Sequence, residues 1–307
     1  MRRRRTKLLL TLLGLALALP ACGKTAEPTA TSAPTVTPTP KRAVTRTPGP
    51  TVAPTAEPDY RMVDVGEYAL ALYCTGVGTP TVILEAGWGD VGETWTLVQP
   101  DVAQHTRVCS YDRVGLGRSD PGPEPTTYRE AVLDLHALLQ NGNIEGPYML
   151  VGHSLGGMYA RLYTHLYPKE VVGLVLVDSS HPDSFERSAA ILPPESPDDS
   201  ESLRTYRDWF TNVTKDPTLT PDLLAPGSLG DLPLVVLTSP VKQRAEDLPI
   251  DISRQFDDIW VELQEELALL SSNSTHILVE GSGHFIQHDD PPLVVEAILG
   301  VLEEARE

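Results

Sequence analysis

The chain has 307 residues, which is enough for one large α/β domain or two small ones, and its net charge is −18 at pH 7. Every acidic residue except Glu27 and Glu57 lies from Asp59 onward, so the folded part lacks the basic surface that nucleic-acid binding needs. The same acidity argues against electrostatic docking to an anionic membrane.

The first 21 residues have the pattern of a secretory signal peptide. Arg2–Arg5 precede the apolar stretch LLLTLLGLALAL at 8–19, which is too short to span a bilayer comfortably. The stretch ends in LPAC, which resembles the bacterial lipoprotein lipobox and implies cleavage before Cys22 and a lipid on its sulfur. An ordinary secretory signal is the alternative. We therefore expect an extracytoplasmic protein that is lipid-anchored to the bacterial cell membrane, or else secreted in soluble form.

Residues 22–58 are interpreted as a disordered tether. The segment 25–58 contains 8 prolines and 10 threonines and almost no large apolar side chain. Such a segment cannot bury enough surface to offset its ordering entropy. The folded domain is therefore expected over 59–307.

From residue 60 onward, short β-branched apolar runs alternate with longer amphipathic segments. This alternation is typical of a mostly parallel sheet covered by helices. It predicts a hairpin at 61–74, a strand at 81–87, a helix near 93–104, a strand at 107–112, a helix at 126–140 opened by a Thr127–Glu130 capping box, a strand at 148–152, a helix at 155–167 and a strand at 171–178. The alternation resumes with a strand at 232–238, a helix around 253–271, a strand at 276–280 and a final helix starting at Pro291–Pro292.

Residues 179–232 interrupt this alternation. The segment has no strand-like run and is rich in Pro, Asp and Ser. It is too long for an ordinary connection between two core strands, and long insertions of this kind are usually functional. We interpret 179–232 as a cap over a pocket.

Two of the three cysteines form a candidate disulfide. If Cys22 carries lipid, Cys74 and Cys109 are left as a pair in an oxidising compartment, each at the end of a strand-like run. Two separate buried thiols fit the sequence equally well. No CxxC motif and no His/Cys cluster indicates a metal, and we expect no metal or cofactor.

The stretch GHSLGG at 152–157 joins the strand 148–152 to the helix that follows it. Its glycines leave room for a sharp turn that lifts the Ser154 hydroxyl above the sheet. The Leu155 amide would then lie at a helix N-terminus, where a negatively charged oxygen is favoured. Ser154 is therefore a candidate nucleophile.

This turn resembles the nucleophile elbow of the α/β-hydrolase fold. ILEAGWGD at 83–90, YDRVGLGRSD at 111–120 and GSGHFIQHDDP at 281–291 resemble the family's oxyanion loop, the loop after its fourth strand and its histidine loop. The resemblance covers about 60–305. It implies a mostly parallel central sheet with helices on both faces and a cap after the sixth strand.

The resemblance also implies roles for single residues. His284 matches the catalytic base, and the backbone amides of Trp88 and Leu155 match the oxyanion donors. Apart from the resemblance, Arg113, Arg118 and Asp120 are expected to have a structural role and to hold the loop after the fourth strand together.

The acid that would orient His284 is less well defined. The family most often places it after the seventh core strand, where Glu246 and Asp247 come well past the strand end. Some relatives place it after the sixth strand, which here ends in Asp178. That strand is expected to run parallel to the strand before Ser154, so Asp178 should emerge on the same edge of the sheet. Asp178 is therefore preferred, and Asp183 is a more remote choice.

The expected function is that of a secreted, lipid-anchored serine hydrolase acting on a small-molecule carboxylic ester or acyl substrate. An amidase resembling proline iminopeptidase is one alternative, because the cap is acidic. A non-catalytic binding lipoprotein on a hydrolase scaffold is another.

Overall fold

The computed structural model describes residues 59–123, 127–212, 225–241 and 247–306. The expected signal peptide, Cys22 and the expected tether lie outside the described residues. Among the helices of the described part, none is long and apolar enough to cross a membrane.

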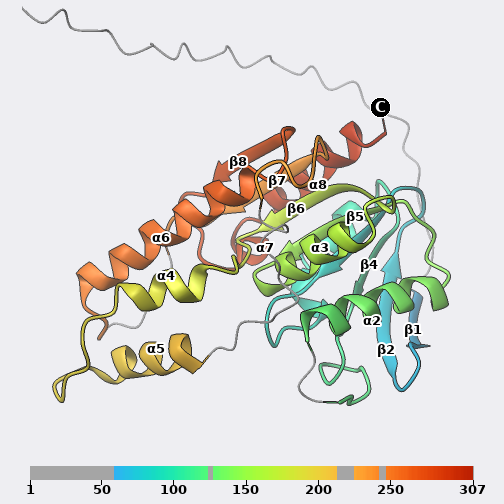
Figure 1. Cartoon of the computed structure of the whole chain (residues 1–307). Coiled ribbons are helices and arrows are strands. Elements are labelled where there is room, and N and C mark those ends of the chain that lie inside the picture. The colour runs from blue at the N-terminus through green and yellow to red at the C-terminus, as the bar shows by residue number, and fades with distance from the viewer. Residues whose placement is uncertain (1–58, 124–126, 213–224, 242–246, 307) are drawn as a thin grey trace, which may run out of the picture. The chain divides into compact units, whose positions relative to one another are not determined.

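Within the described residues, eight strands form one sheet in the order β1-β2-β4-β3-β5-β6-β7-β8 (Figure 1). The pairs β1–β2 and β2–β4 are antiparallel, and all the other pairs are parallel. The mostly parallel sheet is thus confirmed. The strands are β1 (Asp59–Asp64), β2 (Ala69–Thr75), β3 (Thr81–Glu85), β4 (Val108–Tyr111), β5 (Tyr148–His153), β6 (Val171–Val177), β7 (Leu234–Thr238) and β8 (Ser274–Leu278).

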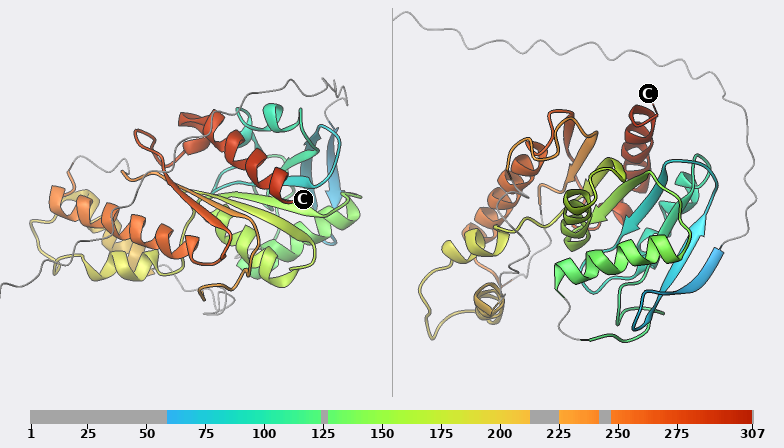
Figure 2. Two further views of the ribbon diagram at one scale, coloured as in Figure 1. Left: turned by 90° about the horizontal axis from the view of Figure 1, so that it is seen from above. Right: turned by 45° about the vertical axis from the view of Figure 1, so that its right-hand side comes forward.

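Helices connect the strands and follow the last one. They are the 3-10 helix η1 (Gly92–Trp95) and the α-helices α1 (Gln99–Val102), α2 (Tyr128–Asn141), α3 (Leu155–Leu166), α4 (Ser184–Ala190), α5 (Glu201–Asn212), α6 (Ile250–Ala268), α7 (Ile286–Asp289) and α8 (Pro291–Glu304). The left view of Figure 2 shows α8 on one side of the sheet and α2 and α3 on the other. This confirms the expected covering of both faces.

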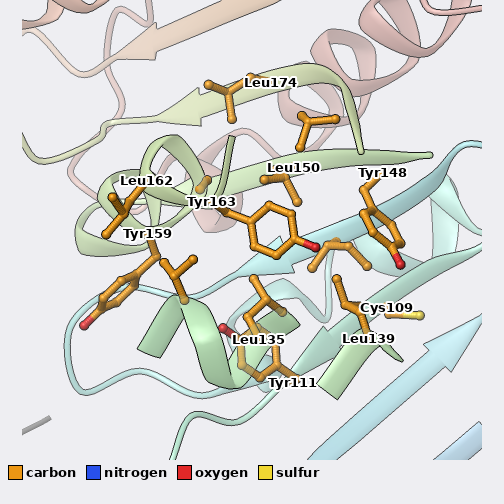
Figure 3. Close-up of a cluster of buried hydrophobic side chains, with 14 of the residues drawn as sticks. Cys109, Tyr111, Leu135, Leu139, Tyr148, Leu150, Tyr159, Leu162, Tyr163 and Leu174 are labelled. Atoms are coloured by element: carbon orange, nitrogen blue, oxygen red, sulfur yellow. The ribbon is translucent and has the colours of Figure 1, made fainter. Parts of the chain in front are cut away.

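Each face of the sheet has its own apolar core. On one face, side chains of α2 and α3 pack on β4, β5 and β6, with Tyr163 and Leu135 among the fully buried ones (Figure 3). On the other face, η1, α1 and α8 bury Trp95, Val102 and Ile298. Strands β3, β4 and β5 are buried along their whole length, as expected for strands covered on both faces.

The expected helix near 93–104 is wrong in extent. The chain forms η1, then the single turn α1, because Pro100 has no backbone N–H and fits only the first turn of a helix. The capping box at the start of α2 is present: the Thr127 side chain accepts from the Glu130 amide, and the Glu130 side chain accepts from the Thr127 amide. The last helix begins at Pro291, as expected, with Asp290 as its N-cap.

The segment between β6 and β7 contains α4 and α5 within its described residues. Leu203 of α5 packs with Ile252 and Phe256 of α6 in a small third apolar cluster. In Figure 1 the helices α4, α5 and α6 lie together, on the opposite side of the molecule from β1 and β2. Part of the segment 179–232 that we expect to cap a pocket, residues 213–224, lies outside the described residues. The cap therefore stays a prediction.

Candidate active site

Ser154 occupies the turn between β5 and α3. Its backbone has φ 51° and ψ −121°, a conformation that residues other than glycine rarely adopt. Such strain persists only where the surrounding structure enforces it, and it is concentrated at functional sites. The amide of Ser154 donates to the carbonyl of Val177 on β6, and its carbonyl accepts from the Ser180 amide at 2.9 Å.

The glycines around Ser154 are required by close backbone approach. A Cβ atom added at Gly152 would lie 2.5 Å from Cα of Gly157, and one added at Gly156 would lie 2.4 Å from the carbonyl oxygen of Glu85. Cβ atoms are essentially never found at such distances. The helix α3 therefore passes against the end of β3 only because Gly156 lacks a side chain, and it begins this close to β5 only because Gly152 lacks one.

His284 lies beside Ser154 although the two residues are 130 positions apart. Its Nε2 lies 2.9 Å from Oγ of Ser154, and its Nδ1 lies 2.6 Å from Oδ2 of Asp178. An ionised carboxylate can only accept, so Nδ1 carries the proton and Nε2 is left to accept from the serine hydroxyl. The imidazole thus presents Nε2 as a hydrogen-bond acceptor to the Ser154 hydroxyl.

Asp178 follows β6 and is fully buried, with φ 44°. Its Oδ1 accepts from the Ser239 amide at 3.1 Å and from the indole Nε1 of Trp260 at 2.7 Å. Both carboxylate oxygens therefore have donors, and the carboxylate is held in the orientation that Nδ1 of His284 requires.

The other candidate acids lie elsewhere. Oδ2 of Asp247 accepts from the Ser202 amide at 3.3 Å, and hydrogen bonds from Ser202 lower the pKa of Asp247. Asp183 precedes α4 and lies 3.9 Å from Arg187. Glu246 lies outside the described residues. Of the described candidates, the structure brings only Asp178 to His284.

Sequence reasoning did not identify Trp260. It lies on α6, 82 residues after Asp178, where an aromatic side chain in an amphipathic helix is usually a packing residue. The one available signal was the indole N–H itself. A buried indole usually donates to an acceptor, so a tryptophan on the inner face of a helix indicates a polar partner nearby.

The loop that carries Trp88 lies against the elbow. A Cβ atom added at Gly87 would be 3.4 Å from Cβ of Ser154, so the backbone preceding Trp88 is close to the serine. The side chain of Trp88 is 76% exposed. Leu155 is the first residue of α3, so its amide belongs to the unpaired first turn of that helix. The amides of residues 88 and 155 thus come from the two segments that meet at Ser154.

Buried polar groups hold the chain after Asp178. Arg161 of α3 donates to the Ser180 carbonyl at 2.7 Å, and Gln264 of α6 donates to the Ser179 carbonyl at 2.7 Å. Burial lowers the pKa of Arg161 to about 9. Burial, aided by the charges of Arg161 and Arg187, lowers the pKa of His181 to about 3.

His181, Asp183 and Glu266 form the single cluster of possible metal ligands within the described ranges, their ligand atoms lying within 4.8 Å of one another. Arg187 donates to both oxygens of Glu266, at 2.6 Å and 2.8 Å. Nδ1 of His181 accepts from the Asp183 amide at 3.1 Å. The cluster is thus an ion-pair network whose principal acceptors are already engaged.

Cys74 and Cys109 are joined by a disulfide between the paired strands β2 and β4. The two residues lie directly opposite each other in that antiparallel ladder. The bond therefore links β2 to the parallel part of the sheet.

The chain belongs to the alpha/beta hydrolase fold family, because the model of that family matches residues 80–254. Its class is therefore that of the hydrolases. The protein YqjL of Bacillus subtilis is 28% identical over 221 residues, which are 72% of this chain and 83% of YqjL.

Two solved structures share the fold. An esterase from Thermogutta terrifontis has a TM-score of 0.57 and 20% identity, with 82% of this chain and 100% of that one covered. A hydrolase from Pseudomonas aeruginosa has a TM-score of 0.56 and 18% identity, with 81% of this chain and 99% of that one covered.

Proposed function

We propose that this hydrolase cleaves a carboxylic ester of modest size through an acyl-enzyme formed on Ser154. The observation that carries the proposal is the line of hydrogen-bond distances from Oγ of Ser154 through His284 to Asp178, at 2.9 Å and 2.6 Å. A hydroxyl, an imidazole and a buried carboxylate in this order make a weak nucleophile reactive.

The mechanism follows from these positions. As Oγ of Ser154 attacks the ester carbonyl, Nε2 of His284 takes its proton, and Asp178 stabilises the imidazolium. The amides of Trp88 and Leu155 donate to the oxyanion that forms. His284 then gives its proton to the leaving alcohol, and water, activated by the same imidazole, hydrolyses the acyl-enzyme and regenerates Ser154.

The amidase alternative needs carboxylates that can hold a substrate amine. Glu266 lies near the loop after Asp178, but both of its oxygens accept from Arg187. Glu266 is therefore already paired with an arginine and does not offer a free carboxylate to such an amine.

The test uses the purified full chain with a fluorophosphonate probe and a series of p-nitrophenyl esters of increasing acyl length. The wild type should be labelled and should turn over short esters, and Ser154→Ala should do neither. A wild-type protein that is not labelled would contradict the proposal. Labelling accompanied by release from prolyl-arylamides, without ester turnover, would establish the amidase instead.

We also propose that the chain is exported and held at the bacterial membrane by a lipid on Cys22, with residues 22–58 as the tether. The basic residues Arg2–Arg5, the apolar run at 8–19 and LPAC support this proposal, as does the Cys74–Cys109 disulfide. Cells fed an alkyne fatty acid should label the wild type and not Cys22→Ser. Equal labelling of both proteins, or of neither, would contradict the anchor.

A further inference from the structure

Arg113, in the loop after β4, reaches across to the loop after β3. Its Nη1 donates to Oε1 of Glu85 at 2.7 Å and to the Ala86 carbonyl at 2.6 Å, and its Nη2 donates to the Gly87 carbonyl. The side chain is buried, and its guanidinium carbon lies 5.2 Å from the ring centroid of Tyr159 on α3. This arginine was expected to hold its own loop together, but these contacts are to the segment that precedes Trp88.

The Gly87 carbonyl and the Trp88 amide belong to one peptide unit. Among the described residues the cis peptide bonds are those before Pro80 and Pro147, so the unit 87–88 is trans and planar. In a trans peptide the C=O and N–H point in opposite directions. Fixing the Gly87 oxygen on Arg113 therefore fixes the direction in which the Trp88 N–H points.

We propose that Arg113 is a positioning residue that aims the Trp88 amide at the oxyanion formed on the Ser154 substrate. The inference rests on the proposed function. The guanidinium acts through the peptide and does not touch the substrate. A charged donor on the Gly87 carbonyl also polarises the peptide and makes its N–H a stronger donor.

Glu85 and Tyr111 keep Arg113 in place. Glu85 is fully buried at the end of β3 and accepts from both Arg113 and the Tyr111 hydroxyl. Burial raises the pKa of Glu85, while the charge of Arg113 and the two hydrogen-bond donors oppose that rise. The peptide is thus held by a preorganised network, which is the condition for effective oxyanion stabilisation.

The geometry requires the fork of an arginine. Lysine would keep the charge beside Glu85 but offers a single ammonium, which cannot hold the Glu85 carboxylate and two successive carbonyls in a fixed plane. Arg113→Lys is therefore the variant that separates charge from orientation.

The experiment measures kcat and KM of the full chain for a short p-nitrophenyl ester, together with the Ki of an alkyl trifluoromethyl ketone. This ketone adds the serine hydroxyl and leaves its oxygen in the position of the oxyanion. We expect Arg113→Lys to lower kcat about 10- to 100-fold, to change KM less than about threefold and to raise Ki by the same factor as kcat falls.

Two control variants separate orientation from charge and from stability. Arg118→Lys makes the same exchange in the same loop at an exposed arginine, which lies 3.9 Å from Glu93, and should leave kcat and Ki unchanged. Tyr148→Phe removes a buried hydroxyl that donates to the Ile144 carbonyl at 2.7 Å. It should lower the melting temperature without changing kcat or Ki.

An active wild type whose Arg113→Lys variant keeps its kcat and Ki would overturn this inference alone. So would a loss of kcat without a parallel rise in Ki. Absence of fluorophosphonate labelling in the wild type would overturn the proposed function and this inference with it. If Arg113→Lys does not fold, the double variant Glu85→Gln with Arg113→Gln is measured in its place. It removes both buried charges together, and the expected changes in kcat, KM and Ki are the same.

Discussion

Trp260 donates its indole N–H to Oδ1 of Asp178 at 2.7 Å, while His284 binds the other carboxylate oxygen, Oδ2. The indole ring also lies edge-on to the His284 imidazole, with ring centroids 6.1 Å apart. Through this bond, α6 is tied to the group that orients the proposed base. The position of α6 therefore affects the geometry of the site directly.

We expect Trp260→Phe to lower kcat about tenfold and to lower the free energy of unfolding by about 1.5–3 kcal/mol, because a buried carboxylate loses a hydrogen bond. Ester kinetics and urea denaturation measure the two effects. Trp95→Phe is the control: Trp95 is fully buried on the other face, and within the described residues its Nε1 has no hydrogen-bond partner. It should lose stability and keep kcat. An equal loss of kcat in both variants would contradict a specific role for Trp260.

Replacing the candidate acid should abolish most of the activity. Asp178→Asn keeps the shape of the side chain but removes the carboxylate that fixes the tautomer of the neutral imidazole and stabilises the imidazolium formed from it, so we expect kcat to fall on the order of 10³–10⁴-fold. Asp247→Asn is the matched control and should remain active, because Asp247 interacts with Ser202. Near-full activity of Asp178→Asn would show that another group orients His284.

The fold and the sharp turn at Ser154 could be predicted because their determinants are local. Strand, glycine turn and helix follow one another in GHSLGG, and Pro291 begins α8 as its missing N–H dictates. Asp178 could be preferred because parallel strands bring their carboxyl ends to one edge. The contacts of Trp260 and Arg113 could not be predicted, since each joins segments whose register is set only when the sheet and helices pack.

Replacing glycine by alanine should have opposite effects at Gly156, where α3 approaches β3 closely, and at Gly300, where the surroundings are open. In Gly156→Ala the new methyl would collide with the carbonyl oxygens of Glu85 and Ala86, at 2.4 Å and 2.6 Å. We expect a loss of about 1–3 kcal/mol in the free energy of unfolding. Gly300→Ala in α8 meets no atom within 4 Å and should gain about 0.5–1 kcal/mol, because alanine is the better helix former. Chemical denaturation distinguishes the two, and a Gly156→Ala variant as stable as the wild type would rule out the close approach.

The disulfide should contribute measurably to stability. Cys74 and Cys109 are 35 residues apart. Because the bond restricts the unfolded chain, we expect it to raise the free energy of unfolding by about 2–4 kcal/mol. Thiol titration of the unfolded, unreduced domain should detect neither cysteine, and Cys74→Ser combined with Cys109→Ser should lower the denaturant midpoint. Reactive thiols at both positions in protein isolated without reductant would contradict the bond.

His181 should make the protein sensitive to mild acid. Its pKa in the folded protein is about 3, against about 6.5 in the unfolded chain, because it is buried beside Arg161 and Arg187. Below pH 6.5 the unfolded state therefore binds a proton that the folded state does not. Stability then falls as the pH decreases toward 3, by about 2 kcal/mol between pH 7 and pH 5.

His181→Asn should remove this pH dependence, since its amide oxygen can still accept from the Asp183 amide and does not titrate. Its stability at pH 7 is expected to be lower, because the buried ring is lost, but the decrease between pH 7 and pH 5 should be smaller by about 2 kcal/mol. His165→Gln, on the exposed side of α3, should keep the wild-type pH dependence. Urea midpoints at pH 5, 6 and 7 measure all three proteins. A His181→Asn variant that still loses as much stability as the wild type would assign the acid sensitivity to other groups.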